Sequence, residues 1–129
     1  MNITIYHSQK KLREPYLSLF REYKKRLGSD ANLELKPLKS NPKEASKGCS
    51  VLVSCAYPLL SSEELAQTLS ELALRSKNQI DIYIEQSPNE PDLAFSLLAN
   101  RASEEMTMSI LFEQIYRAFS ILNGKTYHK

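Results

Sequence analysis

Glycine is scarce in this chain of 129 residues, which contains only Gly28, Gly48 and Gly124. The phosphate-binding loops of nucleotide enzymes need several glycines within a few residues, because the backbone must approach the phosphates closely. The three glycines stand far apart and do not form that spacing. The sequence therefore argues against a glycine-rich phosphate loop and against nucleoside triphosphate chemistry.

Histidine and cysteine are equally sparse, with His7, His128, Cys49 and Cys55 making up the whole set. Neither histidine lies at metal-ligand spacing from the other or from a cysteine, so no metal site is predicted. No local sequence pattern pairs a histidine with a serine or cysteine nucleophile, so the sequence argues against a hydrolase. The two cysteines could in principle pair, but nothing indicates an oxidising compartment, and we expect reduced thiols.

Long apolar runs are absent, since the longest are only a few residues and a bilayer-spanning helix needs about 20. The first residues, Met1 to Ile5, lack the basic start, apolar stretch and cleavage site of a secretory signal. We therefore expect no membrane segment and a cytoplasmic location.

Composition is ordinary, with 42% hydrophobic and 25% charged residues, as in soluble globular proteins. A chain of this length predicts one domain over residues 1–129. The net charge of +2 is too small to identify a nucleic-acid binder, but its distribution is uneven. The basic first half could bind phosphate, and an ordinary solvated surface explains it equally well. The basic residues are Lys10, Lys11, Arg13, Lys24, Lys25, Arg26, Lys36, Lys39, Lys43 and Lys47, and the later acidic ones are Glu85, Glu90, Asp92, Glu104 and Glu105.

Apolar periodicity predicts strands that alternate with helices. Alternating side chains predict strands at residues 3–5, 33–35 and 80–84, and an apolar run predicts a buried strand within residues 50–56. Residues 39–48 are expected to form a loop, and residues 93–98 fit either a strand or a short helix. This alternation predicts a single α/β domain with a mostly parallel sheet flanked by helices.

Three helices are predicted. The first carries an apolar stripe and has Pro15 in its first turn and Gly28 after its last. A capping box of Ser61 and Glu64 starts the second. The third runs from Ser103 to Gly124. The expected apolar stripes are Leu12, Tyr16, Phe20, Tyr23 and Leu27, then Leu65, Leu69 and Leu72, and finally Met108, Leu111, Ile115, Ala118 and Leu122.

The end of the chain carries a specific signature: Glu113-Gln114-Ile115-Tyr116-Arg117-Ala118-Phe119, then Ile121, then Tyr127-His128. This run resembles the closing signature of the SPOUT-class methyltransferases that act on a pseudouridine of large-subunit ribosomal RNA. Two other stretches are similar to that family, namely Ile3-Thr4-Ile5 with residues 22–28 (EYKKRLG), and residues 60–66 (LSSEELA). Together the three stretches span nearly the whole chain.

The resemblance implies a SPOUT-like α/β knot fold, a rare exception among unknotted chains. It also implies a homodimer through the C-terminal helix, S-adenosylmethionine as the cofactor and ribosomal RNA or the ribosome as the partner. Extra apolar residues on that helix support the dimer, although they also fit a helix buried in its own monomer. These residues are Met106, Ile110, Phe112, Phe119 and Ile121.

By resemblance, the catalytic candidates are Tyr127 and His128, which would manage the acceptor's proton, and Arg117, which would orient the RNA or the partner subunit. A solvated tail is the alternative for Tyr127 and His128, and a salt bridge across the dimer is the alternative for Arg117. Val53 and Leu97 stand where the family lines its cofactor, although core packing explains both about as well.

The chain departs from the family around the cofactor. After Ile84 the family has a Gly-Gly pair and a third glycine, whereas this chain has residues 85–91 (EQSPNEP). The segment before Ala94 is also shorter. The family's Pro-His pair and arginine correspond to Ser103, Glu104 and Met108, and its Gly-Lys pair corresponds to Tyr57 and Pro58.

We therefore hypothesise that Glu85 and the proline-stiffened loop exclude the cofactor sterically. The first functional prediction is a ribosomal RNA methyltransferase homologue whose methyl transfer is weakened or lost. The second is a dimeric RNA- or ribosome-binding module without chemistry. A third, weaker possibility is a cleft reshaped for another small ligand. Whether a pocket is open at the loop from Glu85 to Pro91 distinguishes the first two predictions.

Overall fold

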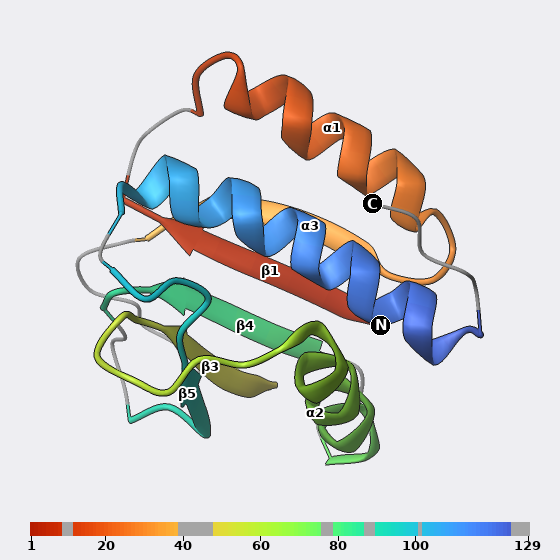
Figure 1. Cartoon of the computed structure of the whole chain (residues 1–129). Helices are drawn as coiled ribbons and strands as arrows, with labels where there is room; N and C mark the ends of the chain where they lie inside the picture. Colours follow the sequence, from red (N-terminus) through yellow and green to blue (C-terminus); the bar gives the residue numbers. More distant parts are fainter. Residues whose placement is uncertain (9–11, 39–47, 76–78, 87–89, 101, 125–129) are drawn as a thin grey trace.

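In the computed structural model, the described part of the chain forms five strands and three helices (Figure 1). The structure describes residues 1–8, 12–38, 48–75, 79–86, 90–100 and 102–124, and of residues 73–75 only the backbone. Along the chain the elements are β1 (Asn2–His7), α1 (Tyr16–Leu27), β2 (Asn32–Pro37), β3 (Cys49–Val53), α2 (Ser62–Arg75), β4 (Gln79–Ile84), β5 (Leu93–Phe95) and α3 (Glu104–Leu122).

All five strands are parallel and form one sheet in the order β2-β1-β4-β3-β5. The predicted α/β class with a mostly parallel sheet is confirmed. The stretch that fitted either a strand or a short helix forms β5, a three-residue strand paired to β3. Its pairing partner lies far away in sequence, so local periodicity could not choose between the two.

One face of the sheet is apolar and carries all three described helices. The register places Ile5, Ile82 and Val51 side by side across three strands, and these side chains belong to the hydrophobic core together with residues of α1, α2 and α3. From β1 to β2 and from β3 to β4 the chain shifts in the same direction across the sheet. Right-handed crossovers therefore put α1 and α2 on the same face. The third helix, α3, packs between them (Figure 1).

The opposite face is polar and aromatic near its centre. The rings of Tyr6 and Tyr83 stack with their centroids 4.8 Å apart. The Gln79 amide donates hydrogen bonds to the Thr4 hydroxyl and to the Asp81 carboxylate. Burial raises the pKa of Asp81, although hydrogen bonds from Gln79 and Tyr6 lower it in part. Burial and the neighbouring Asp81 charge raise the pKa of Tyr6 to about 12.

The helix boundaries follow from the residues at their ends. The predicted capping box is present: the Ser61 amide donates to the Glu64 carboxylate at 3.0 Å, and the Glu64 amide donates to the Ser61 hydroxyl at 3.1 Å. Gly28 ends α1 with φ 54°, a left-handed conformation that favours glycine. The Ser103 hydroxyl caps α3 by accepting from the Met106 amide. The ends of these helices are therefore encoded locally.

The apolar residues that α3 buries and those that it exposes differ from the prediction. Phe112 and Phe119, predicted as surplus apolar surface, are buried in the core of this chain. Leu122, predicted in the core stripe, is 41% exposed because it is the last residue of the helix and extends past the sheet. Exposed apolar surface remains at Met106 and Ile121. The helix therefore buries one broad face and leaves a narrower one outside.

Within the described ranges, no helix is both long and apolar enough to cross a membrane. In the same ranges, no three histidine, cysteine or acidic side chains gather in a group that could hold a metal ion.

Candidate functional site

The carboxyl ends of the strands meet at one edge of the sheet, which is where open α/β sheets bind their ligands. The described residues line two spaces there, one closed and one open. The β3–β5 cleft lies beyond β3, β4 and β5, and the β1–β4 cavity lies beyond β1 and β4, beside the first turn of α3. The β3–β5 cleft is lined by Val53, Ser54, Cys55, Glu85, Ser96, Leu97, Leu98, Asn100, Ala102 and Thr107. The β1–β4 cavity is lined by Tyr6, His7, Ser8, Leu38, Ile84, Glu85, Gln86, Ala102, Ser103 and Glu104.

The β3–β5 cleft is closed. Its volume is about 10 Å³, which is room for about one water molecule. Small-molecule sites usually have about 300–1,000 Å³. No drug-sized or nucleoside-sized ligand fits this space as it stands.

Glu85 closes the cleft. Its backbone has φ 63°, the left-handed region that non-glycine residues rarely occupy. Its carboxylate accepts hydrogen bonds from the Ser54 hydroxyl at 3.1 Å and from the Cys55 amide at 3.4 Å. Its own amide donates to the Val53 carbonyl at 2.8 Å. The side chain is therefore held across the end of β3, in the space that a ligand would need.

Backbone contacts lock the floor of the cleft as well. The Ser54 amide donates to the Phe95 carbonyl, and the Leu98 amide donates to the Ser96 hydroxyl. Beyond β5, Ser96 forms an isolated parallel bridge with Leu59. These bonds tie the segments after β3 and β5 together.

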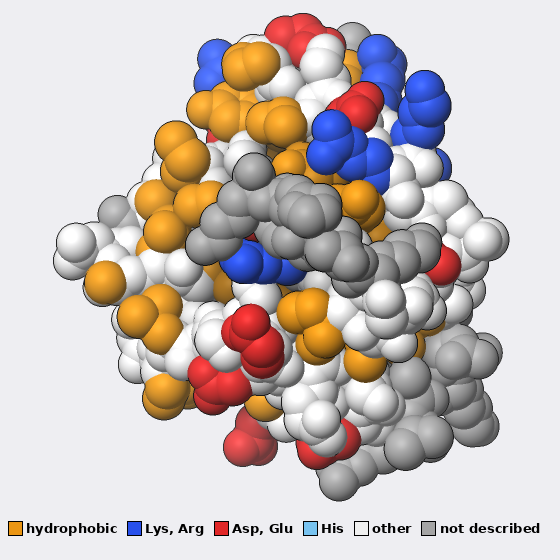
Figure 2. All heavy atoms as spheres, turned by 45° about the vertical axis from the view of Figure 1, so that its right-hand side comes forward, with side chains coloured by type: hydrophobic (Ala, Val, Ile, Leu, Met, Phe, Trp, Pro, Cys, Tyr) orange, Lys and Arg blue, Asp and Glu red, His pale blue; other side chains and the backbone are white. Residues whose placement is uncertain are grey.

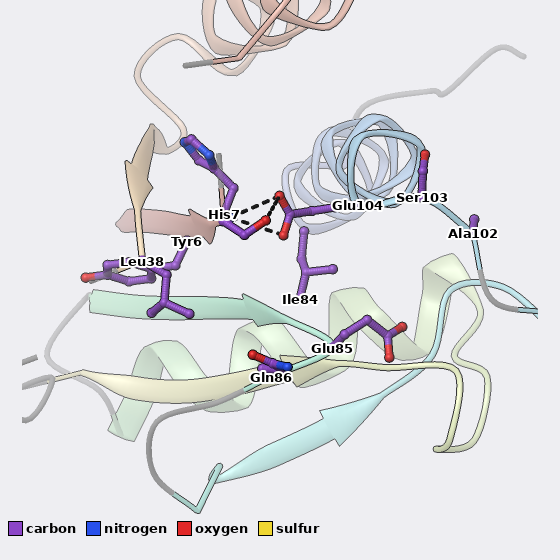
Figure 3. Close-up of a pocket in the computed structure, with 10 residues that line it drawn as sticks. Tyr6, His7, Leu38, Ile84, Glu85, Gln86, Ala102, Ser103 and Glu104 are labelled. Carbon is purple, nitrogen blue, oxygen red and sulfur yellow. Dashed lines mark hydrogen bonds between the residues drawn. The ribbon is translucent and has the colours of Figure 1, made fainter. Parts of the chain in front are cut away.

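The β1–β4 cavity is open, with a volume of about 390 Å³. The Glu104 carboxylate accepts two hydrogen bonds from the Ser8 amide, at 3.0 and 3.1 Å, and one from the Ser8 hydroxyl at 3.0 Å. These bonds hold the start of α3 against the end of β1 (Figure 3). The Glu85 side chain points away from this pair in the same view.

The structure brings only some of the predicted residues together. Val53 and Leu97, the predicted cofactor contacts, both line the β3–β5 cleft. Arg117 lies in the second half of α3 and lines neither space. Tyr127 and His128 lie outside the described residues. The roles of these five residues stay predictions.

Sequence analysis missed Ser54 as the anchor of the Glu85 carboxylate, and Glu104 as a wall of an open cavity. Ser54 belongs to no motif, and Glu104 was singled out only as a position where the chain departs from the family. The signal for the cavity is the strand order, because the chain leaves β1 toward one side of the sheet and leaves β4 toward the other. Strand order is not readable from periodicity, so the sequence could not indicate this crevice.

Comparison with known proteins shows which family the chain belongs to. The family model described as "Predicted SPOUT methyltransferase" matches residues 1–128. The chain belongs to the SPOUT methyltransferase family. The resemblance seen at the C-terminus is thereby confirmed, and the parallel α/β sheet is consistent with the fold of this family.

Relatives of this SPOUT family member share the name ribosomal RNA large subunit methyltransferase H. A Thermoanaerobacter sp. (strain X514) protein, numbered H 1, is 34% identical over 134 residues, with all of both chains covered. A Clostridioides difficile protein is 33% identical over 150 residues, covering 92% of this chain and 94% of its own. A Clostridium novyi protein is 31% identical over 160 residues and covers both chains fully.

The relatives differ in length. Because the Thermoanaerobacter alignment covers both proteins completely in 134 positions, that relative is nearly as short as this chain of 129 residues. The Clostridium novyi alignment needs 160 positions for the same coverage. The short form is thus shared with at least one relative of the same name.

Proposed function

We propose that this SPOUT family member recognises large-subunit ribosomal RNA, and that its methyl transfer is weakened or lost because Glu85 occupies the cofactor cleft. The names of the relatives support the RNA substrate, since full-length matches act, by name, on ribosomal RNA of the large subunit. The observation that carries the second part is the Glu85 carboxylate, bonded to Ser54 and Cys55 in a cleft of about 10 Å³.

The family implies S-adenosylmethionine as the cofactor. The residues present do not fit it, because the cleft has a volume of only about 10 Å³, and the Ser54 hydroxyl and the Cys55 amide already donate to Glu85. The backbone conformation at Glu85 supports the inference that this residue stands where the family has glycine. With φ 63°, the residue has a conformation that glycine adopts freely, and the family has glycine after this strand. A carboxylate side chain thus stands where the family leaves space.

A basic surface along α1 supports RNA binding. Lys24, Lys25 and Arg26 fill the last turn of this helix, and Figure 2 shows Lys and Arg side chains gathered at the α1 end of the molecule. The Arg26 guanidinium lies over the rings of Tyr23 and Tyr116, 5.5 and 5.8 Å from their centroids. Stacking of this kind orders an exposed cation, which reduces the entropy lost when it contacts a phosphate. The surface would supply contacts to the RNA backbone.

The proposal includes a homodimer through α3. Met106, Ile110 and Ile121 lie along one side of this helix, away from its buried face, and Met106 is 46% exposed. Glu113 and Arg117 lie on the same side, so a second antiparallel copy could bring opposite charges together. Sedimentation velocity is expected to give a dimer for the natural protein and a monomer for Ile110→Lys. A natural protein that sediments as a monomer at micromolar concentration would remove the dimer from the proposal.

Titration calorimetry with S-adenosylmethionine tests the closed cleft. The natural protein is expected to show no binding at micromolar cofactor, whereas Glu85→Gly removes the carboxylate, suits the backbone conformation and is expected to restore measurable binding. Gln86→Gly is the matched control, because it adds the same flexibility at the next residue without lining the cleft. Micromolar binding by the natural protein would overturn the proposal.

Methyl incorporation into large-subunit ribosomal RNA separates the two functional predictions. We expect no incorporation by the natural protein and retained, salt-dependent binding of the RNA. Incorporation would favour an active methyltransferase, and Tyr127, His128 and Arg117 would then be the residues to substitute first. Loss of RNA binding at low salt would contradict the RNA-binding proposal itself.

A further inference from the structure

A tight turn fixes where the Glu85 side chain lies. The Gln86 amide donates to the Ile84 carbonyl at 2.8 Å, which closes a three-residue turn centred on Glu85 with φ 63°. Turns of this hand are rare, and they strain a residue that has a side chain. Such strain persists only where the surrounding structure holds the residue in place. The contacts that hold Glu85 therefore point to a functional role of the turn.

The Glu85 carboxylate is held as a bound ligand would be, with one donor on each oxygen. Its Oε2 accepts from the Ser54 hydroxyl at 3.1 Å, and its Oε1 accepts from the Cys55 amide at 3.4 Å. Hydrogen bonds to a charged acceptor are stronger than those between neutral groups. The donors follow β3 whereas Glu85 follows β4, so the contact joins two separate parts of the chain.

The two donors are positioned by bonds that do not involve the Glu85 carboxylate. The Ser54 hydroxyl oxygen accepts from the Ala56 amide at 3.3 Å, which leaves the hydroxyl proton for the carboxylate. The Ser54 carbonyl accepts from the Tyr57 amide at 3.2 Å, and the Ser54 amide donates to the Phe95 carbonyl at 2.9 Å. Ser54 is also 6% exposed. The donor pair should therefore keep its place when the Glu85 side chain is removed.

We infer that Ser54 and Cys55 form a carboxylate-binding subsite, which Glu85 fills as an internal ligand. The subsite takes a small aliphatic carboxylate, because propionate has the same heavy atoms as the Glu85 side chain from Cβ to the two oxygens. The inference rests on the proposed closure of the cleft and deepens it, since Glu85 occupies donors as well as volume. A tethered carboxylate competes at a high effective concentration, so free propionate at millimolar concentration does not displace it in the natural protein.

Chemical rescue of Glu85→Gly by propionate tests the subsite. Glycine suits φ 63°, so this variant keeps the turn and vacates both donors. In a nuclear magnetic resonance titration, propionate is expected to shift the backbone amide signal of Cys55 to saturation in Glu85→Gly and to give no saturable shift in the natural protein. Sodium chloride at the same ionic strength controls for salt. Absence of a saturable shift in Glu85→Gly, or equal shifts in both proteins, would overturn the inference.

Glu85→Gln is the matched control for the loss of negative charge. It removes the same charge as Glu85→Gly, but its amide oxygen can still accept from Ser54 and its side chain still fills the cleft. Propionate is expected to give no saturable shift of the Cys55 amide in Glu85→Gln. Binding as tight as in Glu85→Gly would show that the anion responds to charge alone, and it would refute the subsite.

The charge of the ligand and the Ser54 hydroxyl are tested separately in the Glu85→Gly protein. Propionamide has nearly the shape of propionate but no charge, so its affinity is expected to be about tenfold lower. Adding Ser54→Ala is expected to lower the propionate affinity about tenfold. Adding Ser8→Ala is the control and should leave that affinity unchanged, because Ser8 donates to a glutamate at the β1–β4 cavity instead. Equal affinities for propionate and propionamide, or no effect of Ser54→Ala, would refute the assignment.

The two proposals fail differently. Micromolar binding of S-adenosylmethionine by the natural protein, together with propionate binding by Glu85→Gly, would remove the proposed closure and leave the donor pair standing. Binding of S-adenosylmethionine by Glu85→Gly without binding of propionate would do the reverse.

Discussion

The β3–β5 cleft and the β1–β4 cavity lie at the same edge of the same sheet and share Glu85 and Ala102, yet their volumes are about 10 and 390 Å³. The difference comes from where two carboxylates find donors. Glu85 bonds to Ser54 and Cys55 across the cleft, whereas Glu104 bonds to Ser8 and leaves the cavity free. Hydrogen bonds to single side chains thus set which space at this edge is filled and which stays open.

The largest expected effect is a loss of stability, and it tests how firmly α3, which borders both spaces, is packed in the core. Phe112 is fully buried in that helix, and its ring lies 5.7 Å from the ring of Phe20 on α1. Phe112→Ala is expected to lower the free energy of unfolding by about 3–5 kcal/mol, because it removes a large core side chain and leaves a cavity. Urea denaturation measures the change. A loss below about 1 kcal/mol would mean that α3 is not anchored as the structure shows.

The next effect contrasts the serines that hold the two carboxylates. Ser54 is buried, so Ser54→Ala leaves the Glu85 carboxylate without its hydroxyl donor and is expected to cost about 1–3 kcal/mol. Ser8 is exposed, and Ser8→Ala is expected to change stability by about 0.5 kcal/mol or less, because water replaces the lost bond. Thermal and urea unfolding of both variants provide the measurement. Equal losses of unfolding free energy would contradict the prediction, because they would mean that water reaches both serines to the same extent.

Stability measured over a pH series reports on Asp81, whose carboxyl group lies on the opposite face of the sheet from the helices and not at the edge with Glu85 and Glu104. Burial raises the pKa of Asp81 in the folded protein above its ordinary value of 3.8. The folded state therefore holds this proton more strongly than the unfolded state, and the natural protein loses stability as pH rises from 3.8 through the raised pKa. Asp81→Asn removes that loss, so its stability relative to the natural protein should increase over the same window. Parallel stability curves for the two proteins would contradict the prediction.

The smallest expected effect lies on the outer side of α3. Met106 is 46% exposed, and Met106→Ala is expected to change the free energy of unfolding by no more than about 0.5 kcal/mol at low protein concentration. A loss that grows with protein concentration would instead indicate that this side is covered in an assembly. Denaturation at two concentrations distinguishes the outcomes. Phe112→Ala serves as the comparison from the buried side of the same helix.

Periodicity predicted most elements of this fold, because each element carries its own local signals. The Ser61–Glu64 capping box and Gly28 after α1 occur as expected, and α3 begins beside Ser103, where its start was predicted. The errors lie where a residue's neighbours come from elsewhere in the chain. For Phe119 the sequence left a dimer interface and the monomer core open, and the residue is buried, whereas Leu122 was predicted in the core and is exposed. The chain knot remains a prediction of the resemblance.

The sequence by itself determined the α/β class and the family, because these depend on residue types and on their order. Only the tertiary structure decided that the Glu85 carboxylate folds onto Ser54 and closes one crevice, while a second opens between β1, β4 and α3. The reason is physical. A hydrogen bond between residues 31 positions apart in the chain exists only once parallel strands have brought their ends to the same edge.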